Sequence, residues 1–83
     1  MTHELKTWTE YFRAVRAGNK PFEVRKNDRD FKVGDILALK EFDPVNEVFS
    51  GQEEKRKISC ILKGPGFGIE EGYCVLGLAR ERL

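Results

Sequence analysis

The N-terminal part of the chain carries apolar residues with the period of an amphipathic helix. They recur at steps of three, four and three residues: Leu5, Trp8, Phe12 and Val15. A stripe of this kind packs one face of a helix against a core. Thr7 and Glu10 supply the T-x-x-E pattern of a capping box, and Gly18 stands where a glycine commonly ends a helix. The pattern predicts a helix over residues 8–17, with Trp8 in the core.

Beyond Pro21 the period changes to that of a strand. Proline cannot continue a helix, and the residues after it alternate between apolar and charged: Phe22, Glu23, Val24 and Arg25. Successive side chains of a strand point to opposite faces. We therefore expect Phe22 and Val24 to face the core and the charged pair to lie on the opposite face.

The rest of the chain predicts short strands separated by turns. The candidate strands are residues 35–42, 55–62 and 73–80, and a loop with four glycines, residues 63–72, separates the last two. We expect these last two strands to pair across the glycine loop. Alternation places Ile58, Cys60 and Leu62 on one face of the middle strand and Ile61 on the other.

One leading helix followed by four or five short strands predicts an α+β fold. The expected architecture is a small curled sheet or barrel, with the helix covering one opening. The chain has no repeat, linker or low-complexity segment. We expect a single domain over residues 1–83.

Composition narrows the possible functions. The chain has 83 residues, 40% of them apolar, a net charge of +1 and a pI of about 7.8. Domains that hold nucleic acid mainly through phosphate contacts usually have a pI above about 9, so a nucleic-acid role here must depend on a local pocket. The N-terminus lacks the apolar core of a signal peptide, and no apolar run reaches the roughly 18 residues of a membrane span. We expect a cytoplasmic protein that does not bind membranes.

The sequence gives little sign of a metal or another cofactor, and we expect neither. The two cysteines, Cys60 and Cys74, lack C-x-x-C spacing, and His3 is the only histidine. We expect both cysteines to be buried on neighbouring strands. Residues 27–30, with the sequence NDRD, bring acidic and amide groups together, but Arg29 among them opposes a divalent cation.

The segment from Gly18 to Arg25 carries the most informative spacing of polar residues. Gly18, Lys20, Glu23 and Arg25 form the pattern G-x-K-x-x-E-x-R. One interpretation is a set of exposed strand charges whose surface pairs each contribute about 0–1 kcal/mol. The other is an ion-pair cluster with spare donors for an anion or for the polar edge of a base.

The same pattern resembles the signature of the ASCH domains, relatives of the PUA fold, a small β-barrel associated with RNA binding. The segment FKVGD, residues 31–35, resembles the approach to the next barrel strand of that superfamily. More narrowly, HELKTW, FEVRKNDRDFKVGD and GFGIEEGYCVL resemble a family of short bacterial and phage proteins, the domain of unknown function numbered 3850. The resemblance implies a PUA-like barrel of about five strands with one helix packed against it.

The ASCH resemblance also implies a site. It assigns Lys20, Glu23 and Arg25 to a cleft between the helix and the barrel, and single-stranded RNA or a nucleotide-like molecule as the ligand. Lys6 and Arg13 would extend the contact along the helix. Unpaired bases stack on aromatic side chains, and the candidates for stacking are Trp8, Tyr11, Phe67 and Tyr73.

Two alternatives stay open at this point. One ASCH branch, the acetylcytidine amidohydrolases, has a catalytic lysine that matches Lys20, but Glu23 stands where that branch has threonine. The catalytic glutamate of that branch has no clear counterpart except Glu70 or Glu71. We favour a role without catalysis. The second alternative is a phage or host accessory protein that binds another protein through the helix and the glycine loop.

Overall fold

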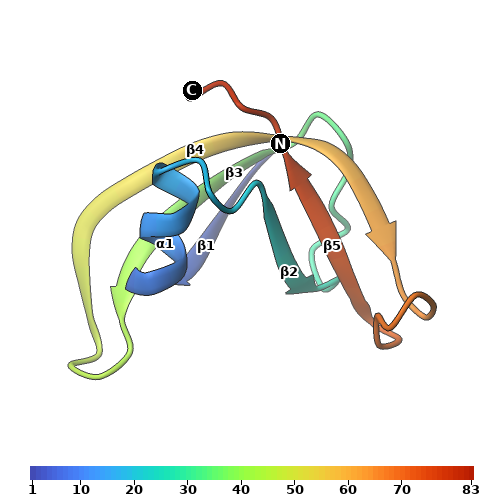
Figure 1. Ribbon diagram of the computed structural model, residues 1–83, viewed down its shortest axis with the longest axis horizontal. Helices are drawn as coiled ribbons and strands as arrows, with labels where there is room; N and C mark the ends of the chain where they lie inside the picture. The colour runs from blue at the N-terminus through green and yellow to red at the C-terminus, as the bar shows by residue number, and fades with distance from the viewer.

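A five-stranded mixed β-sheet, bent along one long strand, forms the frame of the protein (Figure 1). The structure is a computed structural model and describes residues 1–83. Its elements in chain order are β1 (Thr2–Trp8), α1 (Thr9–Arg16), β2 (Phe22–Lys26), β3 (Ile36–Asp43), β4 (Val48–Lys63) and β5 (Tyr73–Leu78). The strand order is β1-β3-β4-β5-β2, with β1 and β3 parallel and the other pairs antiparallel.

Strand β4 joins the two halves of the sheet. It is 16 residues long, and its first part pairs with β3 while its second part pairs with β5. Figure 1 shows it arching over the molecule, with β1 and β3 descending on one side and β5 and β2 on the other. The sheet does not close into the expected barrel, because β1 and β2 remain as its two edges. The fold is therefore an α+β arrangement of one helix and an open mixed sheet.

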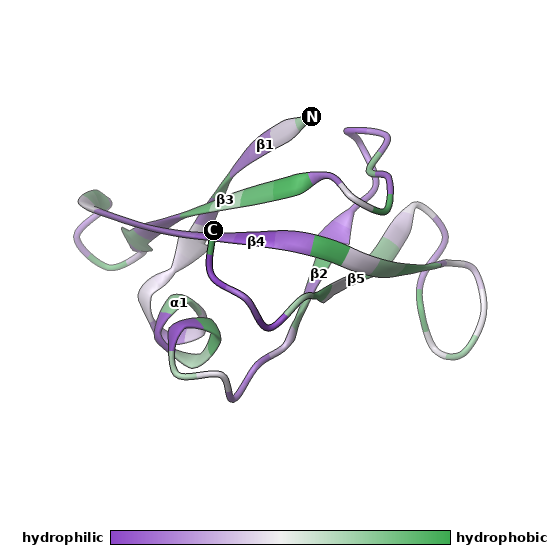
Figure 2. Cartoon of the chain, turned by 90° about the horizontal axis from the view of Figure 1, so that it is seen from above, coloured by the Kyte–Doolittle hydropathy of each residue, from purple (hydrophilic) through white to green (hydrophobic).

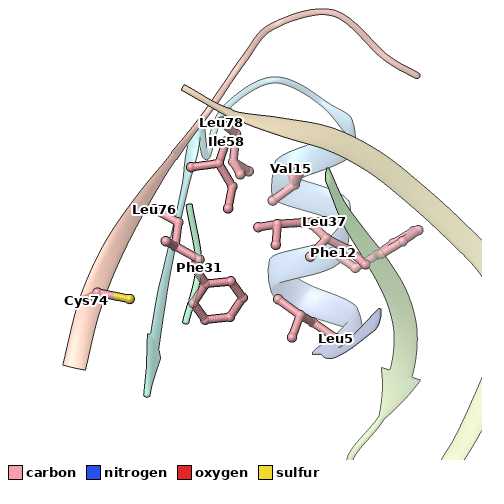
Figure 3. Close-up of a cluster of buried hydrophobic side chains, with 10 residues drawn as sticks. Leu5, Phe12, Val15, Phe31, Leu37, Ile58, Cys74, Leu76 and Leu78 are labelled. Atoms are coloured by element: carbon pink, nitrogen blue, oxygen red, sulfur yellow. The ribbon is translucent and has the colours of Figure 1, made fainter. Parts of the chain in front are cut away.

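The core fills the concave side of this bent sheet. Helix α1 contributes Phe12 and Val15, which meet apolar side chains from both halves of the sheet (Figure 3). The cluster comprises Leu5, Phe12, Val15, Phe31, Leu37, Leu39, Ile58, Cys74, Leu76 and Leu78. In Figure 2 the first part of β3 forms a continuous hydrophobic stretch, as expected for a strand with neighbours on both sides. Helix α1 has only eight residues, and no helix of the chain is long and apolar enough to cross a membrane.

The N-terminal residues differ from the prediction because they form a strand before the helix begins. Residues 2–8 pair in parallel with β3, and Leu5 packs into the core from this strand. The helix begins at Thr9, and its N-cap, Trp8, makes no side-chain capping hydrogen bond. The predicted capping box is wrong, since the Thr7 hydroxyl donates to the carbonyl of Leu5 instead. Trp8 is 50% exposed, so its predicted core position is also wrong.

The face of β2 that points inward is the opposite of the one predicted. Glu23 is only 4% exposed, whereas Phe22 and Val24 are exposed. A buried carboxylate is tolerated only when it is paired and hydrogen-bonded, and Glu23 meets this condition through Lys20 and Arg25. The apolar alternation of this short edge strand therefore did not identify its inner face.

A bulge in β4 changes which residues of that strand face the core. The predicted pairing of β4 with β5 is confirmed, but its register shifts between Ile58 and Cys60. Because of this shift, Ile58 and Ile61 contact the core, while Cys60 and Leu62 are exposed. Cys74 is buried on the neighbouring strand as expected, and the predicted burial of Cys60 is wrong.

A buried carboxylate, Glu54 of β4, ties the end of the helix to the C-terminal segment. It accepts hydrogen bonds from Arg16 of α1 (2.6 Å) and Arg56 of β4 (2.7 Å), and Arg82 lies 3.2 Å away. Burial on its own raises the pKa of Glu54. The guanidinium groups of Arg16, then Arg56 and Arg82, outweigh that effect and hold the pKa below its ordinary value of 4.5.

This arrangement predicts a specific contribution to acid sensitivity. A carboxylate whose pKa is lowered by folding stabilises the protein above its unfolded pKa and loses that contribution as the pH falls through the folded pKa. Between about pH 5 and pH 3, the free energy of unfolding of Glu54→Gln should therefore fall less steeply than that of the wild type. Urea denaturation at several pH values measures both slopes. Glu47→Gln, at an exposed position without an ion pair, should keep the wild-type slope. Equal slopes for Glu54→Gln and the wild type would contradict this assignment.

Candidate functional site

A pocket of about 400 Å³ opens between the two edge strands of the sheet and the start of α1. Its walls come from β1, α1, the connection after the helix and β2: Lys6, Thr7, Trp8, Tyr11, Lys20, Glu23, Val24 and Arg25. Ligand sites commonly have volumes of about 300–1,000 Å³. The pocket therefore has room for one small ligand, such as a single base with part of its sugar.

Glu23 lies at the centre of the polar side of this pocket. Lys20 Nζ donates to Glu23 Oε1 at 2.9 Å, and Arg25 Nε donates to Glu23 Oε2 at 3.2 Å. Lys20 also donates to the carbonyl of Phe22 at 3.1 Å. Each carboxylate oxygen can accept more than one hydrogen bond, so Glu23 orients both cations and keeps acceptor capacity for a ligand.

Arginine side chains bridge the gap between the two edge strands. Arg25 Nη2 donates to the carbonyl of Lys6 at 2.9 Å and to the Thr7 hydroxyl at 3.1 Å. Arg29, just beyond β2, donates from Nη1 to the carbonyl of Glu4 at 2.8 Å. These carbonyls, two residues apart on β1, point away from β3 toward the open edge. The guanidinium groups therefore donate to backbone carbonyls at the edge of β1. In a closed barrel, backbone N–H groups of a neighbouring strand would donate to these carbonyls.

Aromatic side chains form another part of the lining, called here the aromatic wall. The rings of Trp8 and Tyr11 are stacked, with centroids 6.2 Å apart and planes inclined by 21°. Both are about half exposed, so ring surface remains available beside the polar groups. Lys20 Nζ lies 5.4 Å from the Tyr11 centroid, within the range of a cation–π contact. The ammonium group thus connects the aromatic wall to Glu23.

The pocket unites six of the residues that the sequence indicated: Lys6, Trp8, Tyr11, Lys20, Glu23 and Arg25. Thr7 and Val24 also line it, although neither was predicted, because Thr7 was taken for a helix cap and Val24 for a core residue. Trp8, which the stripe assigned to the core and which was also a candidate for stacking, belongs to the aromatic wall. The N-terminal strand pairs with a distant part of the chain, so no local signal revealed that Thr7 would line the pocket.

Other predicted residues lie outside the pocket lining. Arg13 extends from the exposed side of α1, 3.9 Å from Glu41. Phe67 is 92% exposed in the loop between β4 and β5, and Tyr73 begins β5. The exposed pair Glu70 and Glu71 lies in the same loop as Phe67 and does not line the pocket either.

Charge in the pocket is positive but not uniform. The lining holds three cationic residues, Lys6, Lys20 and Arg25, and one carboxylate, that of Glu23. Lys6 Nζ sits 4.5 Å from the ring of Phe42 and makes no ion pair, so it is available at the rim. No three His, Cys, Asp or Glu side chains in the chain gather as they would around a metal ion. The pocket thus offers donors, one acceptor and a π-surface to an electron-rich, planar ligand.

Comparison with known proteins shows the family. A family described as a domain of unknown function, DUF3850, matches residues 2–78, and the chain belongs to it. The chain is also 40% identical over 57 residues to a protein of Escherichia phage P2 named "Uncharacterized 12.9 kDa protein in GpA 3′region". The match covers 69% of this chain, and it spans half the length of the phage protein.

The arginine bridge generates a prediction about stability. Arg25→Met removes the donor to Glu23 Oε2, to the Thr7 hydroxyl and to the Lys6 carbonyl, while Lys20 still donates to Glu23 Oε1. We expect this change to lower the free energy of unfolding by about 1.5–3 kcal/mol. Lys26→Met, on the next residue of β2, removes an exposed cation without an ion pair and should change it by less than about 0.5 kcal/mol. Urea denaturation distinguishes the two. If Arg25→Met proves as stable as Lys26→Met, the guanidinium does not hold the edges together.

Proposed function

We propose that this protein binds one unpaired nucleobase, carried by single-stranded RNA or by a free nucleotide, in the pocket between β1 and β2. The observation that carries the proposal is the juxtaposition of an aromatic wall with a fixed set of donors and one carboxylate. Proteins that recognise unpaired bases combine stacking on the base face with hydrogen bonds to the base edge. Both elements occur within this one pocket.

The aromatic wall supplies the stacking surface. Base–aromatic stacking contributes about 1–3 kcal/mol per base. Trp8 and Tyr11 are already stacked on each other, so little side-chain freedom remains to be lost when a base adds to the stack. A pre-ordered platform of this kind strengthens binding because fewer rotamers have to be fixed.

The polar wall supplies the selectivity. Lys20 and Arg25 would donate to carbonyl or ring-nitrogen acceptors of a base, and Glu23 would accept from an exocyclic amine or a ring N–H. Because Glu23 offsets part of the cationic charge, the pocket attracts phosphate less indiscriminately than a purely basic groove. A net charge of +1 for the whole chain agrees with recognition through a local site.

Kinship with the ASCH domains and the PUA-like superfamily is part of this proposal. Its support is the convergence of Lys20, Glu23 and Arg25, the charged residues of the G-x-K-x-x-E-x-R motif, on one pocket beside the helix. The open sheet would then correspond to a barrel whose last seam is spanned by side chains. The function does not follow from that kinship alone, because one fold hosts many activities.

Binding has more support than amide hydrolysis. The Lys20 amino group is already held in hydrogen bonds to a carboxylate and to a carbonyl, and is not free to attack a substrate amide. The carboxylates considered as partners, Glu70 and Glu71, lie outside the pocket. A protein-binding role draws its support from exposed apolar side chains such as that of Phe67 in the glycine loop.

The only tryptophan of the chain lines the pocket, so its fluorescence reports directly on occupancy. Titration with single-stranded RNA heptamers of each base in about 0.05 M salt should quench Trp8 for the preferred base. Trp8→Leu should weaken binding about 5- to 100-fold, as measured by the anisotropy of labelled RNA. Lys20→Met should weaken it about tenfold, because a charge-assisted contact is lost.

The matched controls are substitutions of the same kind at positions outside the pocket. Phe49→Leu removes an exposed aromatic ring next to Phe42, and Lys63→Met removes an exposed cation at the end of β4. Both should bind RNA like the wild type. The proposal fails if no heptamer and no ribonucleotide binds below about 1 mM at low salt. It also fails if the control variants lose as much affinity as the pocket variants.

A further inference from the structure

A second hollow, of about 350 Å³, lies beside the connection between α1 and β2. Its lining includes Gly18, Lys20 and Pro21 from that connection, Arg56 from β4 and Arg80 from the C-terminal segment. Lys20 lines this hollow and the base pocket alike. The two hollows are therefore neighbours that share one residue.

The second hollow is also lined by cationic residues. Its lining contains Lys20, Arg56 and Arg80 and no carboxylate. Arg80 is exposed and takes part in no ion pair. Four of the seven arginines of the chain, Arg16, Arg56, Arg80 and Arg82, gather at this corner, although the net charge of the whole chain is only +1.

Arg56 is the best-positioned anion-binding group in this hollow. It is 5% exposed, and its Nη1 donates to Glu54 at 2.7 Å and to the carbonyl of Lys55 at 3.0 Å. Its Nε and Nη2 donate to no protein acceptor, and Arg56 is one of the residues that line the hollow. Glu54 thus fixes one side of the guanidinium, and the remaining N–H groups are left for a ligand. A planar guanidinium matches the oxygens of a phosphate better than an ammonium does.

From this geometry we infer that the second hollow holds the phosphate of the ligand whose base occupies the first pocket. The inference rests on the proposed function and extends it from a base to a nucleotide unit. Arg56 and Arg80 bind the phosphate oxygens, and Lys20 lies between the phosphate and the base. A free nucleotide and a phosphodiester of RNA present the same group, so the chemistry of the hollow suits both.

Isothermal titration with the four ribonucleosides and their 5′-monophosphates tests the inference. For the preferred base, the monophosphate should bind about tenfold more tightly than the nucleoside. Arg80→Met should abolish most of this gain and leave nucleoside affinity unchanged; it is expected to fold normally, because Arg80 is exposed and unpaired. Arg56→Met should act in the same direction. Arg13→Met, on the exposed side of α1, is the matched control and should retain the gain.

The outcomes separate the inference from the proposal beneath it. If nucleoside and monophosphate bind equally, or if the gain survives both Arg80→Met and Arg56→Met, the phosphate site is wrong and the base pocket stands. If neither nucleosides, monophosphates nor RNA bind, the proposed function fails and the inference fails with it. A trinucleotide without a terminal phosphate, whose only phosphates are phosphodiesters, identifies the source of the phosphate. Tighter binding than the monophosphate, with the same dependence on Arg80, assigns a phosphodiester, and weaker binding assigns a free nucleotide.

Discussion

The bridge from β2 to the outer edge of β1 is the contact on which the shape of this molecule depends. The sheet ends in two edge strands, and backbone carbonyls of β1 accept from guanidinium groups where a closed barrel would have a fifth pairing, between β2 and β1. Unpaired strand edges are a liability, because they offer a template for another chain. Here Arg25 and Arg29 occupy that edge and hold the two halves of the bent sheet at a set separation.

This bridge also explains why a polar cluster lies on the inner side of β2. Glu23 orients Arg25 by accepting a hydrogen bond at Oε2, and Lys20 pairs with the other carboxylate oxygen, Oε1. Burying an ion pair often brings little or no net stability compared with well-packed apolar groups. A role in shaping the pocket gives a reason for this cluster that stability alone does not. The same bridge leaves a gap beside Trp8 and Tyr11, and this gap is the candidate site.

The sequence predicted the elements that depend on local signals. The helix, β3 and the pairing of the last two strands follow from period, turn residues and the glycine loop, and the structure confirms them. The motif spacing also identified Lys20, Glu23 and Arg25 as one cluster. Each of these predictions depends on residues within one short segment, so contacts with distant parts of the chain did not alter the outcome.

The failures of prediction have a common physical origin in contacts between distant segments. Strand β1 exists because it pairs with β3, more than thirty residues away in the chain. Leu5 therefore lies on a strand and not on the helix, and Trp8, at the junction of strand and helix, is half exposed. On β2, alternation alone predicted Phe22 inside, but Glu23, with its ion pairs, occupies the inner face. A bulge in β4 likewise exposed Cys60.

Site-resolved NMR of the ¹⁵N-labelled protein during titration with its preferred ribonucleotide tests the central claim most directly. The account predicts that the largest shift changes fall on the indole N–H of Trp8 and on the side-chain Nε–H of Arg25, with backbone changes over residues 18–25. Residues of the β3–β4 turn and of the glycine loop should not move. Changes concentrated in the glycine loop around Phe67, with Trp8 and Arg25 unaffected, would contradict the pocket between the edge strands as the ligand site.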